Sequence, residues 1–128
     1  MRMIRPTLAL ALVAAPAVAQ PAPAPRLSLE QTMQLRCSAA FAIIADEQRR
    51  EVRSELTYPP LGERGKEFAV RAGARMMDQL QLSREAYQAL FKAEVESLQR
   101  GSIEAGDPRE YVDAIMRPCL AALDASGL

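Results

Sequence analysis

The chain contains no histidine and no tryptophan, and only two of its 128 residues are cysteine. Without histidine there is no Ser–His or Cys–His nucleophile pair, no histidine ligand for zinc or haem, and no side chain that ordinarily titrates near neutral pH. Catalysis would have to use a carboxyl group with a shifted pKa, a lysine or a tyrosine. No spacing in the sequence singles one of these out. We therefore expect no enzyme, no catalytic residue, no metal and no other cofactor.

Long hydrophobic runs are also lacking, apart from one at the N-terminus. The first five residues carry two arginines, residues 7–15 are apolar, and the small-x-small triplet Ala17-Val18-Ala19 follows, which is the order of a secretory signal peptide. Pro16 interrupts the run, which is shorter than the roughly 20 residues that span a bilayer. We predict a cleaved signal peptide at residues 1–19 and no membrane span. The two basic residues before the apolar run and the excess of arginine over lysine favour a bacterial periplasm over a eukaryotic secretory route.

The predicted mature chain divides into a short tether and one domain. Residues 20–26 are rich in proline and alanine, a composition typical of an extended linker. Residues 27–128 then form a single small domain. Removal of the two arginines in the signal peptide would leave fourteen basic and sixteen acidic side chains. This balance gives no reason to expect nucleic acid or an anionic membrane as a partner.

Four segments of the domain have helical periodicity, and none alternates like a strand. The first begins at Ser28 with a capping box and is expected to run up to a turn at Tyr58–Gly62. The others are expected from about residue 60 or 63 to residue 80, from residue 83 to Gly101, and from residue 107 through Pro118 to about residue 125. Gly65 and Gly73 inside the second segment predict close packing of a neighbouring helix. The sequence thus predicts an all-α fold, most simply a four-helix bundle with up-down-up-down topology.

The cysteines, Cys37 and Cys119, lie on the apolar faces of the first and last predicted helices. Their distances from the helix ends agree within one turn if these two helices are antiparallel neighbours. A secreted chain would join them as a disulfide, and closing a loop of about 80 residues stabilises a fold by roughly 4–5 kcal/mol in the chain-entropy model. A redox or metal site would require Cys-x-x-Cys spacing or additional ligands. We predict a structural disulfide between the first and last helices.

Two exposed features are candidate partner surfaces. The first is the corner containing Tyr58, Pro59 and Pro60, which could present a stiff surface to a partner or simply connect two helices. The second is a stripe of basic residues on the second helix, Arg64, Arg71 and Arg75. These could bind a carboxylate or phosphate, or pair with acidic residues of the same helix. Glu94, on the third helix, is a further candidate for a partly buried carboxylate with a raised pKa.

Three stretches of the chain carry a resemblance to known proteins: residues 36–41 (RCSAAF), 58–65 (YPPLGERG) and 117–120 (RPCL). Together they resemble small, uncharacterised secreted helical proteins of alphaproteobacteria. The resemblance implies location and the cysteine pair only. In build the chain is also similar to periplasmic acid-stress chaperones, which are short helical proteins with one disulfide, although the cysteines here are much further apart. This second likeness is one of architecture.

These observations favour a non-enzymatic periplasmic interaction protein, such as an adaptor, an inhibitor or a chaperone-like protein, with a protein partner. The first alternative is a carrier whose bundle holds a small apolar or lipid-like ligand. The second is an enzyme or enzyme subunit that uses unidentified carboxylates. An exposed apolar patch would favour the first function, an internal cavity of about 300 Å³ or more would favour a carrier, and convergent polar groups in a cleft would favour an enzyme.

Overall fold

The computed structural model describes residues 15–20, 23–52 and 57–128, and in these residues the only regular elements are four α-helices. They are α1 (Leu29–Arg49), α2 (Gly62–Leu80), α3 (Arg84–Glu104) and α4 (Pro108–Ala125). Most of the predicted signal peptide and two positions of the predicted tether lie outside the described residues. Within the described part, no helix is long and apolar enough to cross a membrane.

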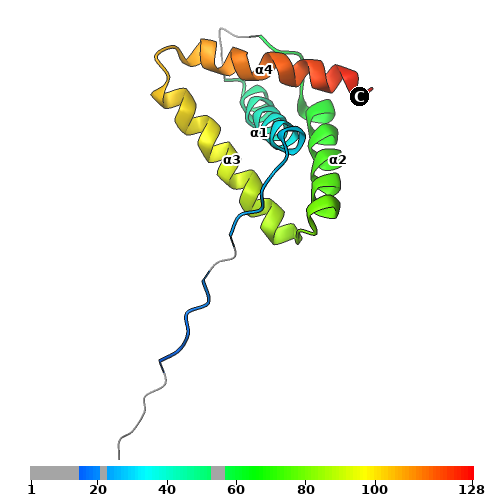
Figure 1. Cartoon of the computed structure of the whole chain (residues 1–128). Helices are drawn as coiled ribbons and strands as arrows, with labels where there is room; N and C mark the ends of the chain where they lie inside the picture. The colour runs from blue at the N-terminus through cyan, green and yellow to red at the C-terminus, as the bar shows by residue number, and fades with distance from the viewer. Residues whose placement is uncertain (1–14, 21–22, 53–56) are drawn as a thin grey trace, which may run out of the picture.

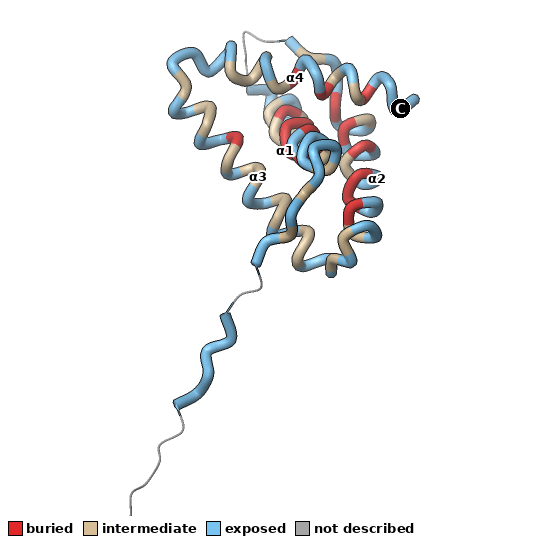
Figure 2. Tube along the Cα trace, in the orientation of Figure 1, coloured by how far each residue is buried: buried red, intermediate tan, exposed pale blue. Residues whose placement is uncertain are grey.

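The helices pack around α1, which contacts each of the other three. In Figure 1, α1 is seen almost end-on between α2 and α3, while α4 crosses one end of the group. Figure 2 shows the buried positions concentrated on α1 and on the sides of α2 and α4 that face it, whereas α3 has a single buried position, Leu98. The predicted all-α four-helix bundle is confirmed, with α1 as the most enclosed helix.

Close contacts of α2 with α1 and with α3 depend on the predicted glycine positions. The rings of Phe41 and Phe68 meet edge to face with centroids 5.3 Å apart, a favourable aromatic geometry. A Cβ atom on Gly65 would lie 3.0 Å from Phe41 Cβ, and one on Gly73 would lie 2.9 Å from the Tyr87 ring. Both glycines therefore have the packing role that the sequence predicted.

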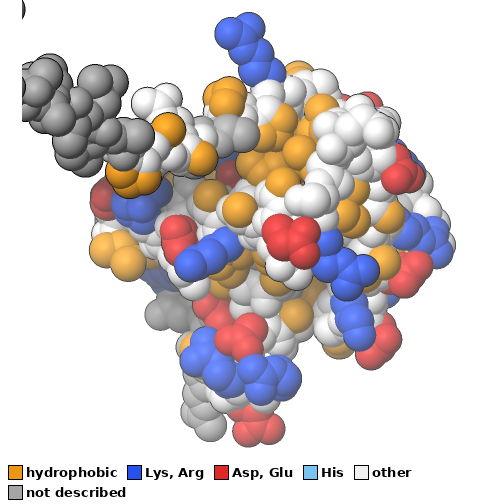
Figure 3. All heavy atoms as spheres, turned by 90° about the horizontal axis from the view of Figure 1, so that it is seen from below, with side chains coloured by type: hydrophobic (Ala, Val, Ile, Leu, Met, Phe, Trp, Pro, Cys, Tyr) orange, Lys and Arg blue, Asp and Glu red, His pale blue; other side chains and the backbone are white. Residues whose placement is uncertain are grey.

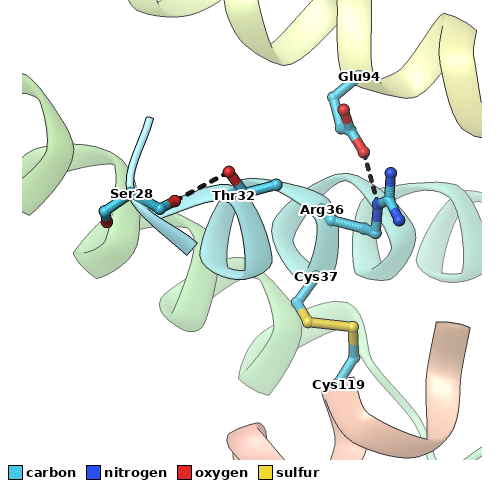
Figure 4. A network of polar contacts seen from close by, with 6 residues as sticks. All are labelled: Ser28, Thr32, Arg36, Cys37, Glu94 and Cys119. Atoms are coloured by element: carbon cyan, nitrogen blue, oxygen red, sulfur yellow. Dashed lines mark hydrogen bonds and ion pairs between the residues drawn. A yellow bond between two sulfur atoms is a disulfide. The ribbon is translucent and has the colours of Figure 1, made fainter. Parts of the chain in front are cut away.

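The disulfide between Cys37 and Cys119 joins α1 to α4 (Figure 4), with the two Cα atoms 5.1 Å apart. Both cysteines are almost fully buried in the central hydrophobic cluster. The predicted bond between the first and last helices is confirmed. Because the two cysteines are 82 residues apart in sequence, the bond restricts nearly the whole domain in the unfolded state.

Three of the four predicted helix starts, those of α1, α3 and α4, are capped by a side chain, whereas α2 begins after Leu61 without one. Ser28 accepts a hydrogen bond from the Gln31 backbone N–H, and the Gln31 side chain accepts one from the Ser28 N–H, which completes the capping box of α1. Ser83 caps α3, and Asp107 caps α4 by accepting from two backbone N–H groups, with Pro108 in the first turn. These starts are correctly predicted because a cap depends on neighbouring residues alone.

Two predicted helix ends are wrong. The first helix ends at Arg49 and not at the Tyr58 turn, because Arg50 caps it and Glu51 adopts a left-handed φ of 54°. The third helix does not end at Gly101 but continues to Glu104. Gly101 lies inside the helix, and the Tyr111 ring of α4 occupies the space that a side chain would fill. As predicted, α4 continues through Pro118.

Candidate functional site

An open groove of about 950 Å³ lies between α1, α3 and α4. Its walls are the C-terminal half of α1, the C-terminal half of α3 and the N-terminal half of α4, and residues 52, 57 and 58 line it beyond the end of α1. Aliphatic side chains from all three helices line it: Ile43, Ile44, Val95, Leu98, Val112 and Ile115. We refer to this feature as the α1–α3–α4 groove.

The floor and margins of the groove differ in burial. Ile44, Leu98 and Met116 are buried in the core, whereas the side chains of Ile43, Val95, Val112 and Ile115 pack on the core but remain partly uncovered. Two aliphatic residues at the margin are more exposed: Val52 at 46% and Ile103 at 84%. The groove therefore carries partly uncovered aliphatic side chains from its floor to its margin, with polar residues such as Gln99 and Ser102 among them.

The Tyr58 corner is fixed beside this groove by the side chain of Gln48, near the end of α1. Gln48 Nε2 donates hydrogen bonds to the backbone oxygens of Tyr58 and Pro59, at 3.4 and 3.0 Å. Gln48 Oε1 accepts one from the Leu61 backbone N–H at 3.0 Å. Leu61 is itself fully buried. The Gln48 side chain therefore ties the end of α1 to the residues that lead into α2.

The hydroxyl of Tyr58 has an unusual environment. Among the described residues it is the sole buried side-chain polar atom without a hydrogen-bond partner. Burial raises the pKa of Tyr58, and the nearby Asp113 carboxylate raises it further. A buried hydroxyl without a partner costs about 1–3 kcal/mol. This unpartnered hydroxyl belongs to a residue that lines the groove.

The charged residues at the groove lie mainly on the α1 side. Arg49 and Arg50 both bind the Asp46 carboxylate, with Arg50 Nε 2.8 Å from Asp46 Oδ2. The hydrogen bond from Arg49 is the main cause that lowers the pKa of Asp46 below its usual 3.8. Glu47 also lines the groove and is half-buried. No arginine or lysine of the described chain forms an ion pair with Glu47.

The residues predicted from sequence as a partner surface do not form one site. Tyr58 lines the groove, while Pro59 and Pro60 are exposed beside it. The basic stripe lies on α2, and none of its members lines the groove. Arg64 binds Asp124 at 2.9 Å and the Leu128 backbone oxygen at 2.7 Å, Arg71 binds Glu67 at 2.7 Å, and Arg75 is exposed.

Glu94 lies outside the groove lining, in contact with α1. Its side chain is 17% exposed and accepts a hydrogen bond from Arg36 Nε at 3.0 Å (Figure 4). The sequence correctly placed this carboxylate in a partly buried position. Its arginine partner identifies it as an interhelical contact that ties α3 to α1.

The helical periodicity of the sequence did not predict the groove, which Val95, Val112 and Ile115 line. These residues have core spacing, and only the inclination of three helices leaves them partly uncovered. One sequence signal was available: Ile103 is aliphatic but lies off the apolar stripe of its helix. Single residues of this kind are common on protein surfaces, so Ile103 indicates a groove only once its place at the groove margin is known.

Other parts of the described surface provide weaker candidates for a functional site. Figure 3 shows a further gathering of hydrophobic side chains near the described N-terminal residues, interspersed with charged ones. Within the described ranges, no cluster of three or more histidine, cysteine, aspartate or glutamate side chains could hold a metal ion. Comparisons with protein families, with curated proteins and with solved structures gave no match to this chain.

Proposed function

We propose that this protein is a secreted, non-enzymatic interaction protein of the periplasm that binds an apolar surface of a protein partner in the α1–α3–α4 groove. One observation carries the proposal: aliphatic side chains from three helices remain partly uncovered around an open groove of about 950 Å³. Apolar area gains roughly 25 cal/mol per Å² when it is removed from water. Contiguous exposed apolar surface is accordingly a feature of interaction sites.

The proposed location is supported by two independent features. The N-terminal sequence has the order of a signal peptide, and the domain contains a buried disulfide. Disulfides form and persist in oxidising compartments such as the periplasm. A secreted protein would therefore acquire the bond between α1 and α4 after export.

A carrier of a small apolar ligand is the second candidate function, and the groove volume supports it. Small-molecule sites usually enclose about 300–1,000 Å³ and cover most of their ligand. The groove has a volume in this range, but its margin carries Ile103, which is 84% exposed. A partner that reaches beyond the floor accounts for this margin better than a small enclosed ligand does.

An enzyme or an enzyme subunit receives less support from the groove chemistry. A catalytic acid near neutral pH needs a carboxyl whose pKa is raised. Asp46 lies at the groove with a pKa that its arginine partners lower. Its environment therefore favours a permanently charged carboxylate over a proton donor.

Native mass spectrometry of the oxidised protein isolated from the periplasm of its host tests the proposal. Ile103→Glu would place a charge at the groove margin, and Leu29→Glu is the matched control, since Leu29 is 88% exposed and lies outside the groove. We expect wild type and Leu29→Glu to retain a bound polypeptide that Ile103→Glu loses. An added mass of a few hundred daltons instead of a polypeptide would support the carrier. Bare monomer for all three proteins would contradict both functions.

A further inference from the structure

We infer that the partner presents a short amphipathic α-helix, which lies along the α1–α3–α4 groove with a basic residue beside Glu47. The inference rests on the proposed function and names the class of partner. It follows from the hydrogen-bonding capacity of the groove, its length, its margin and its charge.

The hydrogen-bonding capacity of the groove favours a helix over an extended segment. The walls are three α-helices, and the backbone groups within a helix are already bonded to one another. The floor between them is aliphatic, with Ile43, Val95, Val112 and Ile115 among its side chains. An extended peptide would bury its own N–H and C=O groups there without partners, which is costly. A helix satisfies its own backbone and can present apolar side chains alone.

The length of the groove sets the length of the partner helix. The lining residues run from Val95 to Ile103 in α3 and from Pro108 to Met116 in α4. Eight residues of helix rise about 12 Å, or about two turns. A partner helix of two to three turns would therefore contact the whole groove. Its apolar residues would recur at spacings of three and four, as in other helices that bind in grooves.

The margin favours a helix over a hydrocarbon ligand. Val52 and Ile103 are respectively 46% and 84% exposed, at positions that also line the groove. A single acyl chain on the floor would leave these two side chains in water. A helix with its side chains is about 10–12 Å across, so its flanks can cover the margin while its apolar face covers the floor.

The charge of the groove indicates which charge the partner helix carries on the flank that faces Glu47. Arg49 and Arg50 are already bound to Asp46. Glu47 lines the same wall, is half-buried, and forms no ion pair with an arginine or lysine of the described chain. A lysine or arginine on the flank of the partner helix would supply the missing countercharge, and electrostatic complementarity of this kind fixes the orientation of a bound helix.

Synthetic helical peptides of about fourteen residues test the inference, each stapled on its polar face because isolated helices of this length are marginal. The first peptide has leucines at i, i+3, i+4 and i+7 and arginines on one flank. The second has glutamates in place of the arginines, and the third has a central proline. A fourth probe is dodecanoate. Binding to the oxidised wild-type domain is measured by NMR chemical-shift titration.

We expect the basic peptide to shift the amide signals of Val95, Val112 and Ile115. The proline peptide should bind about a hundredfold more weakly, and the acidic peptide about two- to fivefold more weakly. Glu47→Gln should remove the preference for the basic flank without changing the folded spectrum. Ile103→Glu should weaken binding of the basic peptide, whereas Leu29→Glu should leave it unchanged.

The contrary outcomes separate the inference from the proposed function. Equal binding of the proline peptide, or no groove shifts with any peptide up to about 1 mM, would overturn the helical partner. If native mass spectrometry nevertheless showed a bound polypeptide that Ile103→Glu loses, the proposed function would still be supported. Groove shifts with dodecanoate and with no peptide would overturn the inference in favour of the carrier.

Discussion

The Tyr111 hydroxyl of α4 lies 2.1 Å from the position that a Cβ atom on Gly101 of α3 would occupy. The aromatic ring thus rests directly on the α3 backbone near the turn between the two helices. Any side chain at residue 101 would displace the ring. Because Tyr111 also lines the α1–α3–α4 groove, this contact links the packing of the α3–α4 corner to the shape of the groove.

We predict that Gly101→Ala destabilises the domain by up to about 2 kcal/mol. Alanine gains roughly 1 kcal/mol in helix propensity, but displacing a packed ring typically costs more than that. Chemical denaturation measures the difference. Gly62→Ala is the matched control, because it lies in a helix and its Cβ would meet nothing within 4 Å. Equal stability changes for the two variants would show that Tyr111 moves without cost.

Replacing both cysteines tests the contribution of the disulfide. We expect Cys37→Ala/Cys119→Ala to unfold with a free energy about 4–5 kcal/mol below that of the oxidised wild type, because the closed loop spans 82 residues. Thermal and chemical denaturation measure the loss. Dithiothreitol should destabilise the wild type to a similar extent and leave the double variant unchanged. A wild-type melting curve that dithiothreitol does not alter would contradict a stabilising bond.

Gln48→Ala should destabilise the corner between α1 and α2. The variant loses three hydrogen bonds, including the acceptor for the partly buried Leu61 N–H, and we expect a cost of about 1–2 kcal/mol. Hydrogen exchange of the Leu61 amide should become faster. Gln48→Glu keeps the acceptor and loses the two donated bonds, so its Leu61 amide should stay protected. Unchanged exchange in Gln48→Ala would show that another group protects this amide.

The pKa of Asp46 provides a prediction about pH. Its folded-state pKa lies below 3.8, and the hydrogen bond from Arg49 is the largest single cause, while the charge and the hydrogen bond of Arg50 lower it further. The carboxylate therefore stabilises the folded state above about pH 4 and loses that contribution as the pH falls through the lowered pKa. NMR titration should show that Arg49→Gln raises the Asp46 pKa more than Arg50→Gln does. The reverse order would assign the main effect to Arg50.

The features that the sequence predicted well are local or covalent. Ser28, Ser83 and Asp107 cap helices through residues within three positions, so neighbouring residues suffice to locate these starts. The disulfide followed from the apolar spacing of two cysteines and an expected oxidising compartment. The all-α fold followed from the helical spacing of apolar residues in four segments, none of which alternates like a strand.

The features that the sequence did not predict depend on contacts between distant residues. Glycine often marks the end of a helix. Gly101 instead lies inside α3, where the Tyr111 ring of the next helix occupies the space that a side chain would need. The charged run after Asp46 has helical spacing, yet the chain turns at Glu51. The groove depends on how three helices are inclined, and no local pattern distinguishes a half-buried Val112 from a fully buried one.

The disulfide makes two walls of the groove a single cross-linked unit, since it joins α1 to α4. The third wall, α3, contributes one fully buried residue, Leu98, and contacts α1 through the Arg36–Glu94 ion pair. Oxidation thus ties α1 to α4 by a covalent bond, whereas α3 is held against both helices by noncovalent contacts. For the partner that we propose, the spacing of α3 from the cross-linked pair would set the width of helix that fits the groove.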